Sequence, residues 1–240
     1  MALLALDGLS KTYGSLRVID GLSFDLAEGE ALGIIGPNGA GKTTMFNLIA
    51  GGVRADAGRI RFDGADVTGL SPQARCRAGI GRSYQIPHPF AKMTVFENLL
   101  VGAAFGGGRP ERACYDDCAR ILEDTGLMAK ANQLAGSLTL LERKRLELAR
   151  DLATRPRLLL LDEIAGGLTE AECQELIATI RGLRAAGVSL IWIEHIVHAL
   201  MSVVDRLIVI NFGAKIDDGA PEAVMANPAV QEIYLGIDVS

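Results

Sequence analysis

The sequence predicts an α/β fold in which helices cover a parallel sheet, with an antiparallel β subdomain and an inserted α-helical subdomain. Three observations predict it. Continuous apolar strands alternate with a helical pattern in the C-terminal part, as in parallel sheets that are buried on both faces. A glycine-rich loop separates an early apolar strand from a helix, and a mostly helical pattern interrupts the strands between residues 86 and 154.

The N-terminal part is predicted to contain strands, the loop and one helix. Glycine, serine and aspartate turn signals separate three apolar segments, which are Leu3–Leu9, Leu22–Leu26 and Glu30–Ile35. We expect all three to be strands. The loop opens a helix over residues 41–50, and Arg59–Asp63 alternates polar and apolar residues like a half-exposed antiparallel strand.

The remaining elements follow the same patterns. Helices are expected at Glu111–Thr125, Leu141–Ala153 and Glu170–Ala186, and buried strands at Leu158–Leu161, Val188–Ile193 and Arg206–Ile210. We therefore predict a single domain over residues 1–240. Its core combines residues 1–85 and 155–240, and residues 86–154 form the helical subdomain.

Composition excludes several classes of protein. Of the 240 residues, 49% are hydrophobic and 22% charged, which is ordinary for a globular chain. A net charge of −5 argues against nucleic acid as a partner. No apolar stretch approaches the roughly 20 residues of a membrane span, and the first residues lack the basic region of a signal peptide. We expect a cytoplasmic protein that reaches a membrane only through a partner.

The four cysteines are expected to be structural or incidental. Cys114 and Cys118 are four residues apart on an expected helix, a spacing that would suit a metal. No second pair of ligands accompanies them. A framework of disulfides is not expected in a reducing compartment.

The glycine-rich loop predicts a phosphate-binding site. It matches G-x-x-x-x-G-K-[ST] in full. The motif residues, together with Thr44 that follows them, are Gly36, Pro37, Asn38, Gly39, Ala40, Gly41, Lys42, Thr43 and Thr44. Glycines let backbone N–H groups approach phosphate oxygens, and the following helix adds partial positive charge. Lys42 can reach the β- and γ-phosphates of ATP, and the Thr43 hydroxyl can bind Mg²⁺. A chance match occurs in about one per cent of chains of this length, so we predict a P-loop that binds ATP and Mg²⁺.

Two carboxylates follow a buried strand. Asp162 and Glu163 end the run Leu158–Leu161, and ligands of open α/β sheets bind beyond the carboxyl ends of strands. Asp162 is placed to hold Mg²⁺, directly or through water, and Glu163 can polarise a water aimed at the γ-phosphate. A purely structural alternative is that the acidic pair ends the strand and caps a turn. His195 follows another apolar strand and could contact the γ-phosphate, although a lone histidine there is more often structural.

The order of these elements resembles that of the ABC transporter ATPases, over essentially the whole chain. The resemblance implies that Tyr13 stacks on adenine, that Gln85 senses Mg²⁺ and the attacking water, and that His195 is the switch histidine. It also implies that residues 93–98 belong to the segment at the transmembrane contact. The ATPase would form a head-to-tail dimer with a second ATPase subunit and bind transmembrane permease subunits at the inner face of the plasma membrane.

Within that family, the chain looks most like the ATPases of branched-chain (hydrophobic) amino-acid importers. The resemblance rests on Arg82–Gln85, Arg145–Arg150, Ile193–His195 and the C-terminal Ile233–Gly236. It implies a solute-binding protein as a further partner. Lipopolysaccharide-type exporters share the Tyr-Leu-Gly ending and remain an alternative. Non-transport ABC ATPases remain another, although the long insertions, second ATPase domain or basic extensions typical of them are absent from this sequence.

One motif departs from the family pattern. The signature Leu-Ser-Gly-Gly-Gln aligns with residues 138–142, where Thr139 keeps a hydroxyl but leucines replace both glycines and Glu142 adds a negative charge. Thr139 and Glu142 also match a helix capping box, with 143–145 expected on the exposed side of the helix. Ile164 and Thr169 replace an expected proline and aspartate. We therefore expect the ATP on a partner's P-loop, closed by Thr139, to turn over poorly.

Overall fold

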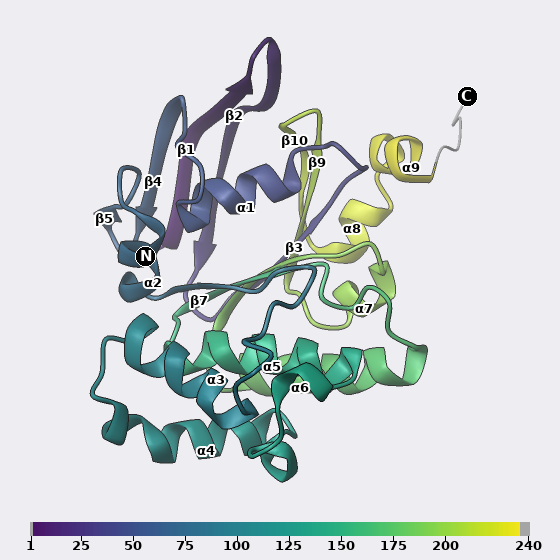
Figure 1. Ribbon diagram of the computed structural model, residues 1–240. Coiled ribbons are helices and arrows are strands. Elements are labelled where there is room, and N and C mark those ends of the chain that lie inside the picture. The colour runs from purple at the N-terminus through teal and green to yellow at the C-terminus, as the bar shows by residue number, and fades with distance from the viewer. Residues whose placement is uncertain (1, 236–240) are drawn as a thin grey trace. The chain divides into compact units, whose positions relative to one another are not determined.

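The structure, a computed structural model, describes residues 2–235 and divides into two compact units (Figure 1). Within the described residues, one unit contains 2–72 and 189–235, and the other contains Gln73–Val188. Both combine helices with strands, so the predicted α/β class is confirmed. The division into a core and a helical subdomain at residues 86 and 154 stays a prediction.

The first unit contains the predicted antiparallel sheet. Its strands lie in the order β2-β1-β4-β5, and they span β1 Ala2–Tyr13, β2 Leu16–Ala27, β4 Ala57–Phe62 and β5 Ala65–Asp66. The predicted strands at Leu3–Leu9 and Leu22–Leu26 are too short. Gly21 reads as a turn signal, but it and Gly8 have φ of 60° and 59° and lie near register shifts between β1 and β2. These glycines make bulges, so the strands bend and continue.

A second set of strands in this unit surrounds β3 (Ala31–Ile35), which pairs in parallel with β8 (Ser189–Ile193) and β9 (Arg206–Asn211). β10 (Ala214–Gly219) pairs with β9 in the antiparallel direction. Every residue of β3 and β8 is buried, which explains their continuous apolar sequences. The helices of this unit are α1 Lys42–Ala50, α7 Val197–Met201, α8 Pro221–Met225 and α9 Pro228–Leu235.

The second unit holds one short parallel pair of strands, β6 (Ile80–Arg82) and β7 (Leu158–Asp162). Every regular element between them is helical: α3 Val95–Val101, a π-helix at Gly102–Gly106, a 3₁₀ turn at Glu111–Cys114, α4 Tyr115–Asp124, 3₁₀ turns at Met128–Lys130 and Ala135–Ser137, and α5 Leu140–Ala153. α6 spans Glu170–Ala185, and α2 spans Pro72–Ala78. No helix of the described chain is long and apolar enough to cross a membrane.

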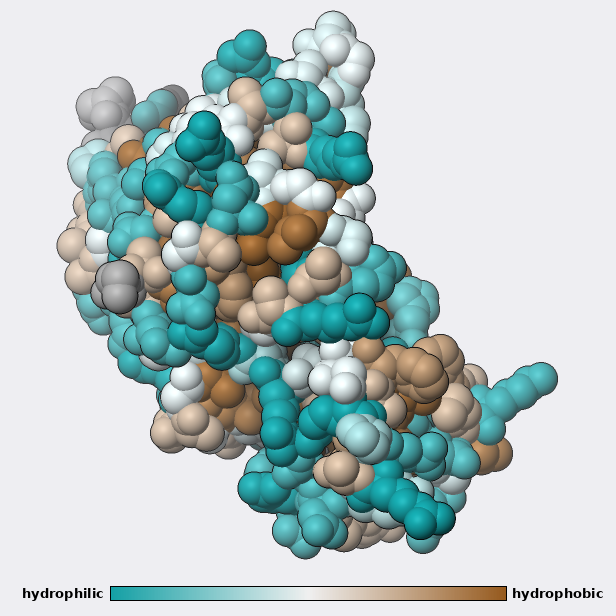
Figure 2. Space-filling view, turned by 90° about the vertical axis from the view of Figure 1, so that its left-hand side faces the viewer, coloured by the Kyte–Doolittle hydropathy of each residue, from teal (hydrophilic) through white to brown (hydrophobic). Residues whose placement is uncertain are grey.

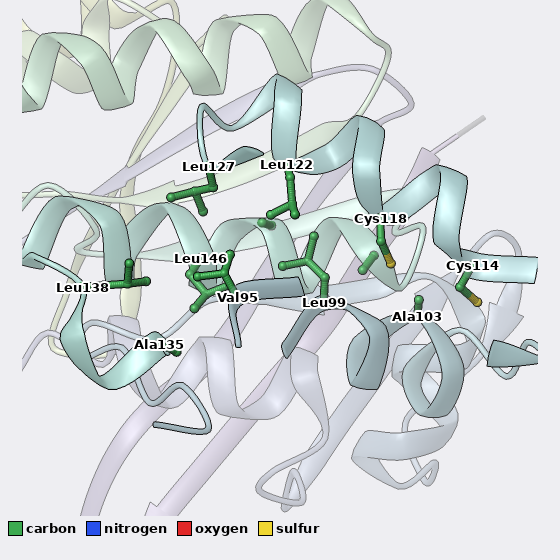
Figure 3. Close-up of a cluster of buried hydrophobic side chains, with 12 residues drawn as sticks. Val95, Leu99, Ala103, Cys114, Cys118, Leu122, Leu127, Ala135, Leu138 and Leu146 are labelled. Atoms are coloured by element: carbon green, nitrogen blue, oxygen red, sulfur yellow. The ribbon is translucent and has the colours of Figure 1, made fainter. Parts of the chain in front are cut away.

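The helices α3, α4 and α5 enclose a hydrophobic core that includes two of the cysteines (Figure 3). Cys114 and Cys118 are fully buried among Leu99, Leu122 and other apolar side chains. Burial raises the pKa of the Cys118 thiol to about 11. Within residues 2–235, no group of three or more His, Cys, Asp or Glu side chains is placed to hold a metal ion. The two thiols act as small hydrophobic side chains.

Candidate nucleotide site

The predicted loop lies between β3, which ends at Ile35, and α1, which begins at Lys42. This is the strand–loop–helix order that the motif requires. Gly41 caps α1 with φ of 101°, and Gly39 has φ of 81°. Both values are costly for residues with a side chain, since a Cβ then crowds the backbone. Glycine therefore favours this loop conformation at both positions.

Neighbouring strands press against the loop from outside. A Cβ built on Gly41 would lie 2.6 Å from the Val18 carbonyl oxygen of β2, and one on Gly36 would lie 2.1 Å from the Ile210 carbonyl oxygen of β9. The Gly213 N–H, in the β9–β10 turn, donates to the Ala40 carbonyl at 3.0 Å. The sequence analysis missed this support. The Asn211-Phe212-Gly213 turn signal after an apolar strand could have indicated the turn, but not its contact with the loop.

Lys42 closes the loop from inside. Its side chain is buried, with 6% of the residue surface exposed, and its Nζ donates to the Gly36 and Pro37 carbonyls at 2.7 and 3.0 Å. The ammonium group therefore lies within the loop, where a phosphate would meet it. Asn38, Gly39 and Thr43 are exposed on the loop, so backbone and hydroxyl groups are open to a ligand.

Two more predicted residues lie in the same unit. Tyr13 ends β1 with 47% of its surface exposed, and the Lys11 ammonium lies 5.4 Å from its ring centroid. An exposed ring of this kind can stack on a base. His195 follows β8 and is also exposed, and its backbone N–H donates to the Glu194 carboxylate at 3.1 Å. The roles of both residues stay predictions.

The second unit contains the acid pair and Gln85. Asp162 is the last residue of β7, and Glu163 follows with φ of 49°, which is unusual for a residue other than glycine. The Gln85 Nε2 donates to Glu163 Oε2 at 2.6 Å. The Gln85 amide oxygen is then left as an acceptor. The oxygen donors of Thr43, Asp162 and Gln85 are the kind that Mg²⁺ prefers, so the residues predicted to bind the ion fit its chemistry.

Arg82 is a residue that the sequence analysis did not assign to the site. Its Nη2 lies 3.2 Å from Asp162 Oδ2, and both side chains are almost fully buried. The backbone explains the contact. Arg82 pairs in register with Leu160, and the Ser83 N–H donates to the Leu160 carbonyl at 2.9 Å. The backbone after β6 therefore runs beside the end of β7, where Asp162 lies. An arginine that follows two apolar residues in a strand was the available signal.

The region aligned with the family signature forms the predicted capping box. Thr139 caps α5, the Glu142 carboxylate accepts from the Thr139 N–H at 2.9 Å, and Glu142 is paired with Lys130. Although burial opposes it, these contacts lower the pKa of Glu142 below its usual value. The prediction that residues 143–145 face solvent together is wrong, because Lys144 is buried. Three successive residues of a helix spread over more than half a turn.

The region after the acid pair also forms a cap. Thr169 caps α6, and its box partner is Glu172. Ile164, which stands where the family has proline, is buried.

Hydrophobic side chains also reach the surface among polar ones (Figure 2), and exposed ones in the second unit include Tyr84, Ile86 and Phe90. These three precede residues 93–98, the segment that the family resemblance places at the transmembrane contact.

Two family models match parts of this chain. A family described as "ABC transporter" matches residues 19–166, and one described as "Branched-chain amino acid ATP-binding cassette transporter" matches residues 216–239. Residues 236–239 of the second match, which include Gly236 of the C-terminal motif, lie outside the described residues.

Several curated proteins match nearly the whole chain. The high-affinity branched-chain amino acid transport ATP-binding protein BraF of Pseudomonas aeruginosa is 39% identical, with 98% of each chain covered. The corresponding protein LivG of Escherichia coli is 36% identical with the same coverage. A solved structure of the ADP conformation of an ATP-binding cassette of an ABC transporter has a TM-score of 0.90 and 31% identity, covering 99% of this chain and 100% of that one.

Proposed function

Since this chain belongs to the ABC transporter family of ATP-binding proteins, we propose that it powers an importer of branched-chain or other hydrophobic amino acids or related small solutes. Its curated relatives that span nearly the same length carry names for branched-chain amino acid transport. The lipopolysaccharide-type exporter and the non-transport ATPase are not favoured by these matches. The transported solute is the part of the proposal that rests on names alone.

Nucleotide binding is assigned to the P-loop. Backbone N–H groups of the non-proline residues in 36–44 and the Lys42 ammonium hold the phosphates of ATP, and the Tyr13 ring stacks on adenine. Thr43, Asp162 and Gln85 would hold Mg²⁺ with oxygen atoms. When bound, the ion neutralises charge on the β- and γ-phosphates.

Hydrolysis is assigned to the groups after the buried strands. Glu163 accepts a proton from a water molecule whose oxygen attacks the γ-phosphorus. The bond between that phosphorus and the bridging oxygen breaks, and ADP and inorganic phosphate leave. The hydrogen bond from Gln85 holds the Glu163 carboxylate at 2.6 Å and so orients the base. His195 contacts the γ-phosphate and stabilises its charge.

The partners follow from the family. We assign a second ATPase subunit, arranged head to tail, and permease subunits that dock near residues 85–96. A solute-binding protein would deliver the solute. Residues 86–154 serve as the helical subdomain that carries the signature region, and residues 1–85 with 155–240 serve as the core. The chain would then lie on the cytoplasmic face of the plasma membrane, held there by the permease.

Leu140, Leu141 and Glu142 support one further assignment. The site that Thr139 closes, on a partner's P-loop, turns over slowly, because Leu140 and Leu141 hinder close backbone approach and Glu142 repels phosphate. The site on this chain's own P-loop works normally. Kinetics of the complex with Glu163→Gln, set against the equivalent change in the partner, check this. Equal losses from the two changes argue against asymmetry.

The observation that carries the ATPase proposal is the buried Lys42 ammonium, which donates to the Gly36 and Pro37 carbonyls inside the glycine-rich loop. Purified protein with Lys42→Ala should lose affinity for a fluorescent ATP analogue by at least tenfold, the usual scale for a lost charge-assisted contact. Glu163→Gln should keep that affinity and lose turnover by 100-fold or more, as expected for a lost general base. The exposed Glu123→Gln is the matched control and should change neither. Unchanged affinity and turnover in Lys42→Ala would refute the proposal.

A further inference from the structure

Arg82 forms a buried ion pair with Asp162, the carboxylate that is assigned to the divalent cation. Arg82 Nη2 lies 3.2 Å from Asp162 Oδ2, with 8% and 7% of the two side chains exposed. The Arg82 guanidinium carbon also lies 4.9 Å from the centroid of the Tyr84 ring. A buried pair of this kind persists because each charge compensates the other. A cation at Asp162 would therefore share that carboxylate with an arginine.

A second carboxyl lies within electrostatic reach of the same arginine. Asp151 is on α5, and its Oδ2 is buried without a hydrogen-bond partner. Burial and the nearby Glu147 raise the pKa of Asp151 well above its usual value, and attraction to Arg150 and Arg82 opposes the shift. Buried acceptors are rarely left unsatisfied. Asp151 is thus an acceptor that a moving guanidinium could satisfy.

We propose that Arg82 is a positioning residue that holds Asp162 while no cation is bound there and shifts to the Asp151 oxygen when a divalent cation binds. The proposal rests on the assigned role of Asp162 as a cation ligand. Arg82 is repelled by a divalent cation at Asp162 because like charges a few ångströms apart interact strongly in a poorly solvated site. The Asp151 carboxyl gives the guanidinium a place to go without leaving the protein interior.

The exchange would link the cation to α5. This helix begins at Thr139, in the region aligned with the signature, and Asp151 lies near its other end. Gln85 binds Glu163 three residues beyond Arg82. A shift of Arg82 therefore acts on the segment that orients the proposed base, and on the helix that starts at the signature region.

Binding of Mn²⁺ tests the proposal directly. Electron paramagnetic resonance would measure free and bound Mn²⁺ at saturating non-hydrolysable ATP analogue, at pH 8, with the full-length protein. Arg82→Met should tighten Mn²⁺ binding roughly tenfold, because a unit positive charge about 4 Å from the cation is removed. Asp151→Leu should weaken it, because Arg82 then has no alternative acceptor and stays on Asp162. The exposed Arg112→Met is the matched control.

The outcomes separate this proposal from the one before it. Loss of Mn²⁺ binding in Asp162→Asn supports the assigned cation ligand, and retention of binding would overturn that assignment. Unchanged or weaker binding in Arg82→Met overturns the role of Arg82, and unchanged binding in Asp151→Leu overturns the exchange. Arg82→Gln serves if the methionine variant does not fold. In both Arg82 variants, Mn²⁺ should raise the melting temperature more than it does in the unaltered protein.

Discussion

Replacement of Gly41 by alanine isolates the effect of the close contact behind the P-loop. Gly41 has φ of 101°, and a Cβ there would lie 2.6 Å from the Val18 carbonyl oxygen, whereas ordinary contacts begin near 3.4 Å. The loop or β2 must then move by about 0.8 Å. Gly39 offers a matched control, because its φ is 81° but no atom lies within 4 Å of the added Cβ.

The two costs can be estimated separately. A left-handed backbone costs alanine about 1–2 kcal/mol at either position. Crowding adds about 1–3 kcal/mol at Gly41 alone. We therefore expect Gly41→Ala to lower the free energy of unfolding by about 2–5 kcal/mol and Gly39→Ala by about 1–2 kcal/mol.

Thermal denaturation followed by circular dichroism measures the difference. For a chain of this size, each kcal/mol corresponds to about 2–4 °C in melting temperature. The affinity for a fluorescent ATP analogue should also fall about tenfold or more in Gly41→Ala, since displaced N–H groups no longer meet the phosphates. Equal melting temperatures for the two variants would refute the reasoning, because the contact with Val18 would then have no energetic effect.

Three further predictions follow from other parts of the chain. Thr139→Ala should destabilise the protein by about 0.5–2 kcal/mol in urea unfolding, with recovery in Thr139→Ser, because only the hydroxyl cap restores the box. The Cys118 thiol, buried and with a pKa of about 11, should react with iodoacetamide at pH 8 only after denaturation in guanidinium. Although burial opposes it, Arg206 and Lys215 hold the pKa of Asp218 below its usual value of 3.8. Its stabilising contribution is therefore present above pH 4 and is lost as the pH falls through the folded pKa, so melting curves of the unaltered protein and Arg206→Gln should converge below pH 4.

Local patterns in the sequence predicted the buried strands and the cap of one helix. The apolar runs became β3, β7, β8 and β9, and the spacing of Thr139 and Glu142 predicted the cap of α5. The turn signal at Gly21 was misleading, since a glycine with positive φ serves a bulge as well as a turn.

Contacts between distant residues were beyond such reasoning. The pair of Arg82 and Asp162 spans 80 residues in sequence, and it depends on the register of β6 against β7. No local pattern determines that register, because parallel strands pair through long crossover connections. The support of the P-loop by the β9–β10 turn has the same origin. The motif predicted the groups that meet a nucleotide, and the tertiary structure shows which residues support the loop.

The start of α5 shows how one substitution pattern can favour a helix and disfavour a ligand. The Glu142 carboxylate accepts from the Thr139 N–H and pairs with Lys130. A negative charge in the first turn stabilises a helix through its dipole. That same charge fills the position to which a helix N-terminus would otherwise attract a phosphate. The leucines need no unusual backbone, because α5 is regular from Leu140 onward. The departure from the signature is therefore compatible with a well-formed helix, and its cost falls on contact with an anion, as the proposal of unequal ATP sites requires.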